Sequence, residues 1–174
     1  DFALKTKPDA VLFANLSSGY VNPGWRNVIP ENAGPIHISN ISSLYEEGLS
    51  GVVKELYEED IPVIIVQNVP EPDLVQAPPS ILHKVFPPNV ITEFDPTNAL
   101  TLRAQAALIE ERVAKKYPGT VLFDPVKTLC SKSSCKLVTD GKSNYLDPRH
   151  LSREGSLLLV PQLMDSISQI QMRD

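Results

Sequence analysis

Asp147 and His150 are the residues whose types and spacing most clearly suggest chemistry. They lie three apart in Tyr145-Leu-Asp-Pro-Arg-His-Leu-Ser-Arg-Glu-Gly155, just before a predicted helix. A carboxylate so placed can accept a hydrogen bond from one imidazole nitrogen, which fixes the tautomer and leaves the other nitrogen to act as a general base. The alternative interpretation is a surface turn followed by a helix cap. An Asp-x-x-His spacing alone does not separate the two.

The helix after this pair is predicted to run over 153–170, with Ser152 as its N-cap. Gly155 would allow its first turn to approach the sheet closely. Pro161 lies inside the helix and should kink it, because proline lacks the N–H that continues the hydrogen-bond ladder.

Three apolar runs, 10–16, 62–68 and 120–123, predict the strands that position this site. They alternate with helical periodicity over 41–58 and 98–116, so the fold class is α/β with a parallel sheet covered by helices. The chain of 174 residues fits one domain, 1–174. Three strands would leave long apolar edges, so we expect the sheet to be incomplete.

Smaller features refine this outline. The helix over 41–58 should bury Val52 and could start with a capping box of Ser43 and Glu46, although Ser39 or Asn40 could start it earlier. Asp95 should cap the helix over 98–116, which should bury Leu102 among other residues. Residues 17–35 read as a long loop, and Asp140-Gly141 suggests a short hairpin.

Cys130 and Cys135 are the two cysteines, five apart in a segment rich in serine and lysine. Such polar surroundings favour a surface loop closed by a disulfide, worth about 2 kcal/mol for so short a loop. Two free buried thiols are the alternative. A zinc site would need two further ligands, and we expect none. An oxidised pair would indicate an extracytoplasmic compartment.

Charge and composition exclude other classes of function. The formal net charge is −5 and the basic residues are scattered, so a nucleic-acid surface is not expected. No apolar run approaches the roughly 20 residues that span a bilayer. No glycine-rich phosphate loop occurs, and we expect no cofactor.

A longer pattern contains the Asp147–His150 pair: Asp124-Pro-x-x-x-Leu-Cys130, Cys135, Asp140-Gly141, Tyr145, Asp147-x-x-His150-Leu-Ser-x-x-Gly155. This pattern resembles the C-terminal block of SGNH domains fused to membrane acyltransferase-3 proteins. Val66-x-Asn-Val-Pro70 is similar to the strand-and-proline segment of those domains. The resemblance implies a flavodoxin-like SGNH three-layer sandwich and a Ser-His-Asp triad, with Asp147 and His150 as its acid and base.

The sequence departs from that family at the nucleophile, because Gly-Asp-Ser occurs nowhere in it. We therefore expect a fragment that begins after the nucleophile and lacks the first strands, with a degenerate domain as the alternative. Ser17, Ser18 and Ser39 have no nucleophile-elbow pattern. The resemblance offers Asn15 as the oxyanion donor, with capping of loop backbone as its alternative role.

The resemblance implies transfer of an acyl group, usually acetyl, to hydroxyls of a cell-surface glycan, or hydrolysis of such esters. The partners would be an acyl donor, a carbohydrate acceptor and a membrane acyltransferase domain of the same protein. The chain would then be extracytoplasmic and tethered to the membrane by a region before residue 1. A non-catalytic module that binds a glycan or stabilises a partner is the alternative.

Overall fold

The computed structural model describes residues 2–22, 41–72 and 91–171. These form two compact units. The first comprises Asp1–Asn68, Leu102–Phe123 and Asp165–Asp174, and the second comprises Val69–Thr101 and Asp124–Met164. Each is described in turn.

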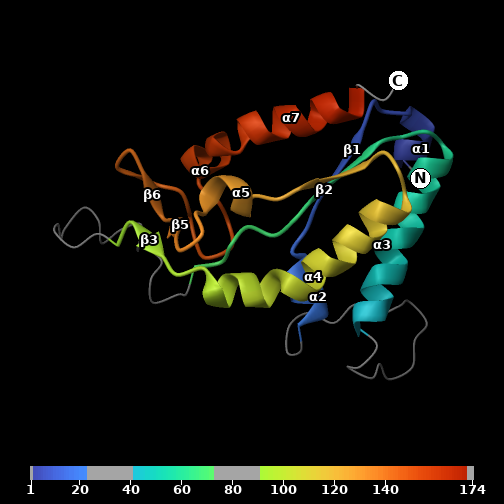
Figure 1. Cartoon of the computed structure of the whole chain (residues 1–174). Helices are drawn as coiled ribbons and strands as arrows, with labels where there is room; N and C mark the ends of the chain where they lie inside the picture. Colours follow the sequence, from blue (N-terminus) through green and yellow to red (C-terminus); the bar gives the residue numbers. More distant parts are fainter. Residues whose placement is uncertain (1, 23–40, 73–90, 172–174) are drawn as a thin grey trace. The chain divides into compact units, whose positions relative to one another are not determined.

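A parallel sheet forms the centre of the first unit. Strands β1 (Val11–Ala14), β2 (Val63–Val66) and β4 (Thr120–Phe123) pair in the order β1-β2-β4, and both pairs are parallel (Figure 1). The α/β class and the parallel pairing of the three predicted runs are therefore confirmed. The runs at 10–16 and 62–68 contribute four residues each to the ladder.

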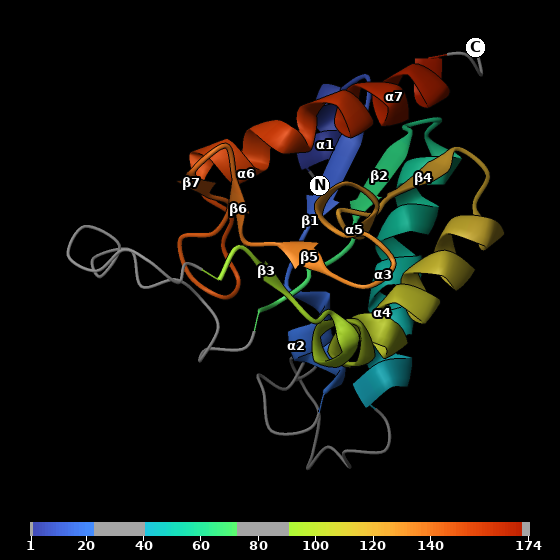
Figure 2. The same cartoon turned by 60° about the vertical axis from the view of Figure 1, so that its left-hand side comes forward.

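Helices α3 (Ile41–Glu58) and α4 (Thr97–Lys116) pack side by side against one face of this sheet (Figures 1 and 2). Val63 and Ile65 point toward them, whereas Ile64 is buried on the opposite face. The helices bury residues at three- and four-residue spacing, as an amphipathic helix does. The core residues are Tyr45, Leu49, Val53 and Leu56 of α3, Ala106, Ile109 and Val113 of α4, and Tyr117 directly after α4.

Two residues predicted for this core are exposed instead: Val52 by 45% and Leu102 by 49%. In α4 the buried stripe is completed by Arg103 and Glu110, which are 6% and 1% exposed. A hydropathy pattern assigns charged residues to the solvent side. Such a pattern therefore misses these two charged residues of the buried stripe.

Helix α1 (Phe2–Thr6) precedes β1. Two short features of the first unit differ from the sequence prediction. The stretch expected as loop begins with helix α2 (Ser17–Val21). The predicted capping box at Ser43 is wrong, because α3 already begins at Ile41, which agrees with the alternative of an earlier start. Glu46 instead accepts hydrogen bonds from the Arg112 guanidinium of α4 at 3.0 and 2.6 Å.

The second unit is built from short strands and turns. Strand β3 (Glu93–Phe94) pairs antiparallel with β5 (Cys135–Lys136), and β6 (Val138–Thr139) with β7 (Lys142–Ser143). The predicted hairpin is confirmed: Asp140 and Gly141 turn the chain at φ 49° and 74°, the conformation a two-residue turn requires. A short helix, α5 (Val126–Leu129), precedes the first cysteine.

Two predicted caps are confirmed in this unit. Asp95 Oδ1 accepts from the backbone N–H and the hydroxyl of Thr97 at 2.8 and 2.6 Å. Ser152 Oγ accepts from Gly155 N–H at 3.0 Å. The single helix expected at the C-terminus is instead two, α6 (Arg153–Leu158) and α7 (Val160–Gln171). The break falls at Leu159, because Pro161 has no N–H to donate back to the preceding turn.

Candidate active site

Backbone pairing closes the loop that carries Asp147 and His150. Tyr145 and Leu151 form an antiparallel bridge, and Leu146 N–H donates to the carbonyl of His150 at 2.8 Å. The two ends of the loop, Tyr145 and Leu151, therefore lie next to each other. Its tip is exposed, which suits a group that must meet a substrate.

The carboxylate of Asp147 organises this tip. Its Oδ1 accepts from the backbone N–H groups of Arg149 and His150 at 2.8 and 2.9 Å. Oδ1 and Oδ2 lie 2.9 and 2.7 Å from His150 Nδ1. The predicted hydrogen bond is therefore present. The amide of Arg149 first, and then the imidazole of His150, hold the pKa of Asp147 below its usual value of 3.8.

This geometry defines the chemistry that the imidazole can perform. An ionised Asp147 requires Nδ1 of His150 to carry the proton, which leaves the lone pair on Nε2. The His150 side chain is 73% exposed. The pair can therefore deliver a general base to a hydroxyl that approaches from solvent.

Asn144 connects the loop to the rest of the second unit from a fully buried position. Its N–H donates to Leu137 O, and its side-chain amide donates to Lys136 O and Thr139 Oγ1. The backbone carbonyl of Asn144 accepts from Ser152 N–H at 2.9 Å. The start of α6 is thereby held against the segment that leads into the loop.

Gly155 is necessary at this contact. A Cβ atom there would overlap the backbone carbonyl of Asn144. Close approach at Gly155 was predicted from the sequence, but with the sheet as the neighbour. The structure corrects this: Asn144, directly before Tyr145, is the backbone that Gly155 approaches.

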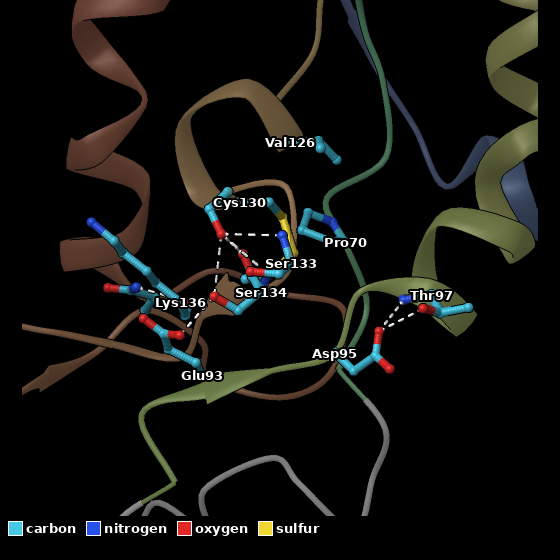
Figure 3. The surroundings of a disulfide bond; sticks show 12 residues. Pro70, Glu93, Asp95, Thr97, Val126, Cys130, Ser133, Ser134 and Lys136 are labelled. Carbon is cyan, nitrogen blue, oxygen red and sulfur yellow. Dashed lines mark hydrogen bonds between the residues drawn. A yellow bond between two sulfur atoms is a disulfide. The ribbon is translucent and has the colours of Figure 1, made fainter.

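Cys130 and Cys135 form a disulfide, as predicted, and the alternative of free thiols is wrong. Figure 3 shows the bridge with the serine loop that it closes, in which Ser134 Oγ donates to Glu93 Oε2 at 2.6 Å. Cys135 is fully buried and packs in one cluster with Phe94 and Tyr145. The disulfide therefore supports the core beneath the first residue of the Asp147–His150 loop.

Asn15, the residue offered as an oxyanion donor, follows β1 in the first unit, and its side chain is exposed. Its carbonyl accepts from the Asn68 side-chain amide at 3.3 Å. Asn68 Oδ1 also accepts from Ser17 Oγ at 2.5 Å and from Ser18 N–H at 2.8 Å. Asn68 thus fixes the turn after β1. Ser17 and Ser18 are buried, which agrees with the expectation that they are not nucleophiles. Ser39 lies outside the described residues.

A buried polar cluster in the first unit was missed by sequence reasoning. Tyr45 donates to Glu110 Oε1 at 3.1 Å, and Arg103 donates to Gln67 Oε1 at 3.1 Å. Burial raises the pKa of Glu110 above its usual 4.5, and the polar side chains around it, Tyr45 among them, oppose this only in part. Burial first, and then the charge of Glu110, raise the pKa of Tyr45. One feature of the sequence could have indicated this cluster. Arg103 and Glu110 lie seven residues apart, so both fall on the helix stripe whose other residues are buried.

The described residues show neither a metal site nor a membrane span. Among residues 2–22, 41–72 and 91–171, no group of three or more His, Cys, Asp or Glu side chains could hold a metal ion. None of the helices in that part of the chain is long and apolar enough to cross a membrane.

Among the comparisons with known proteins, a family model matches the chain. No curated protein matches the chain, and no solved structure does. The family model described as "SGNH domain (fused to AT3 domains)" matches residues 1–165, which include the sheet, the disulfide and the Asp147–His150 loop. A match over nearly the whole sequence shows the family, which in general has esterase or acyltransferase activity and accompanies membrane acyltransferase domains. The chain therefore belongs to the SGNH domains of the kind fused to acyltransferase-3 (AT3) proteins.

Proposed function

We propose that this chain supplies the acid and the base of a Ser-His-Asp triad that transfers an acyl group, most simply acetyl, to a glycan hydroxyl or hydrolyses such an ester. The observation that carries the proposal is the pair of short contacts between the Asp147 carboxylate and His150 Nδ1. The family match supports the reaction class.

The proposed reaction follows from the tautomer that Asp147 selects. Nε2 of His150 accepts the proton of a serine hydroxyl as the serine oxygen attacks the acyl carbonyl. The resulting imidazolium, stabilised by Asp147, returns the proton to the leaving oxygen as the tetrahedral intermediate collapses. The acyl-serine is then attacked by a sugar hydroxyl or by water, and His150 accepts that proton and returns it to serine. Each half-reaction leaves the proton count unchanged.

The serine itself is proposed to come from a Gly-Asp-Ser segment outside these 174 residues, because the sequence contains none. We assign Asn15 as the candidate oxyanion donor. Its support is its place after β1, since groups at the carboxyl end of parallel strands commonly line active sites. A preorganised amide donor of this type is worth roughly 3 kcal/mol in the transition state.

The proposed location is extracytoplasmic, beside the membrane acyltransferase domain that accompanies this family. The disulfide supports it, because such bonds persist in oxidising compartments.

The test is activity of the natural protein including the segment before Asp1. Wild type, His150→Ala and Lys142→Ala are compared on an activated acetyl ester and on acetyl transfer to an oligosaccharide. Lys142 is exposed at the first position of β7 in the same unit and serves as the matched control. We expect His150→Ala to abolish both activities and Lys142→Ala to retain them. Equal turnover by wild type and His150→Ala would reduce the pair to a structural cap, whereas absence of turnover in the wild type would favour a binding module.

A further inference from the structure

The Asp147–His150 loop is tied to the rest of the second unit by residues 70 and 71. The hydroxyl of Tyr145, at the start of the loop, donates to the carbonyl of Pro70 at 2.9 Å. Nε of Arg149, near its end, donates to Glu71 Oε2 at 3.2 Å. Two adjacent residues thus hold the loop on both sides of Asp147.

The two attachments differ in burial. Tyr145 is 3% exposed, forms an edge-on contact with Phe94 and shares a core cluster with Cys135. Pro70 is buried, and Figure 3 places it among the residues around the disulfide. That end of the loop is part of the core. At the other end, the side chains of Arg149 and Glu71 are 40% and 17% exposed.

Arg149 lies between Asp147 and His150 in the sequence and contacts the carboxylate of Asp147. Its backbone N–H donates to the same Oδ1 that lies 2.9 Å from His150 Nδ1, and it is the largest influence lowering the pKa of Asp147. Restricting the Arg149 side chain therefore restricts the backbone amide that aims the carboxylate. The tip itself is exposed to solvent, with Leu146 exposed by 65%.

We propose that Glu71 is a positioning residue for the Asp147–His150 pair, acting through Arg149; the inference rests on the proposed function for its catalytic consequence. Glu71 follows the Val66-x-Asn-Val-Pro70 segment in the sequence. Glu71 Oε2 accepts from Arg149 Nε, and the backbone N–H of Arg149 donates to Asp147. Misplacing a general base lowers kcat and leaves substrate affinity unchanged.

The first arm measures kinetics in the natural protein. Glu71→Gln should lower kcat by roughly three- to thirtyfold with KM unchanged, because a partly exposed ion pair is modest in energy but directional. Arg149→Glu should lower kcat by at least as much. The double exchange of Glu71→Arg with Arg149→Glu should recover most of kcat. Glu154→Gln is the matched control, since Glu154 is a nearby carboxylate that pairs with Arg153.

The second arm needs no turnover. In the 174-residue chain, the Nδ1–H proton of His150 is followed by NMR, where a hydrogen bond to a carboxylate moves it far downfield. Glu71→Gln should shift or broaden this signal, and Glu154→Gln should leave it unchanged, with circular dichroism confirming that both variants fold.

The outcomes separate the two proposals. Loss of activity in His150→Ala with no effect of Glu71→Gln on kcat or on the signal overturns the positioning role alone. A rise in KM for Arg149→Glu, with Glu71→Gln silent, also overturns it and places Arg149 on the substrate. If His150→Ala stays active, the proposed function fails. The NMR arm then still decides whether Glu71 orients the pair.

Discussion

Replacing Gly155 with alanine tests the contact that docks α6 beneath the Asp147–His150 loop. In a helix free of tertiary contacts, glycine to alanine stabilises by up to about 1 kcal/mol, because alanine loses less backbone entropy on folding. At Gly155 the new methyl group would overlap the carbonyl of Asn144, which is backbone and cannot rotate away. The structure therefore predicts the opposite sign.

The magnitude follows from the two opposing effects. Forcing a methyl group into closely packed backbone costs about 1–3 kcal/mol. Subtracting a helix-propensity gain of about 1 kcal/mol leaves a net loss of up to about 2 kcal/mol for Gly155→Ala. Gly155 does not adopt a positive φ, so conformational strain adds nothing to this figure.

Helix α3 offers matched controls, because a Cβ at Gly48 or Gly51 would meet nothing within 4 Å. Gly48→Ala and Gly51→Ala should each stabilise by about 0.5–1 kcal/mol. Urea denaturation followed by circular dichroism gives all three free energies of unfolding. If Gly155→Ala stabilises the chain as the controls do, the approach of α6 to Asn144 and the reasoning built on it are refuted.

Three further predictions concern the disulfide, the buried carboxyl group and the catalytic acid. Replacing Cys130 and Cys135 together by alanine should cost about 2 kcal/mol, from closure of a loop of sequence separation 5; urea denaturation showing no change would mean that the bridge contributes nothing. Glu110→Gln should gain stability relative to wild type as pH rises through and above 4.5, because the folded state holds the Glu110 proton more tightly than the unfolded state; parallel pH curves would contradict a raised pKa. Asp147→Asn keeps an oxygen for the amides of Arg149 and His150 but loses the charge that stabilises the imidazolium. In the natural protein kcat should therefore fall by about 10²-fold or more with the fold retained, and unchanged kcat would exclude Asp147 as the acid of the triad.

The parallel sheet and the disulfide could be predicted from the sequence because local patterns determine them. Continuous apolar runs favour parallel strands, and those at 10–16, 62–68 and 120–123 pair as expected, although only β2 among them is buried on both faces. The cysteines lie five apart in a polar loop, so their pairing requires no long-range information. The Asp147–His150 hydrogen bond is likewise local, since three residues and one turn bring the groups together.

What the sequence could not determine depends on contacts between distant segments. Arg103 and Glu110 are buried because Gln67, directly after β2, and Tyr45 of α3 form hydrogen bonds with them, whereas hydropathy assigns such residues to solvent. Helix α2 forms where a loop was expected because Asn68, 50 residues away, accepts from Ser18 N–H.

The same reason explains the supports of the catalytic loop. The spacing of Asp147 and His150 indicates the pair, but nothing near it in the sequence indicates that Glu71, 78 residues from Arg149, would hold it. Gly155 was recognised as a site of close approach, yet its neighbour proved to be Asn144. Residue type and spacing determined which groups could react. The tertiary structure decided which distant groups orient them, because hydrogen bonds and packing across the fold are set by backbone paths that local pattern does not encode.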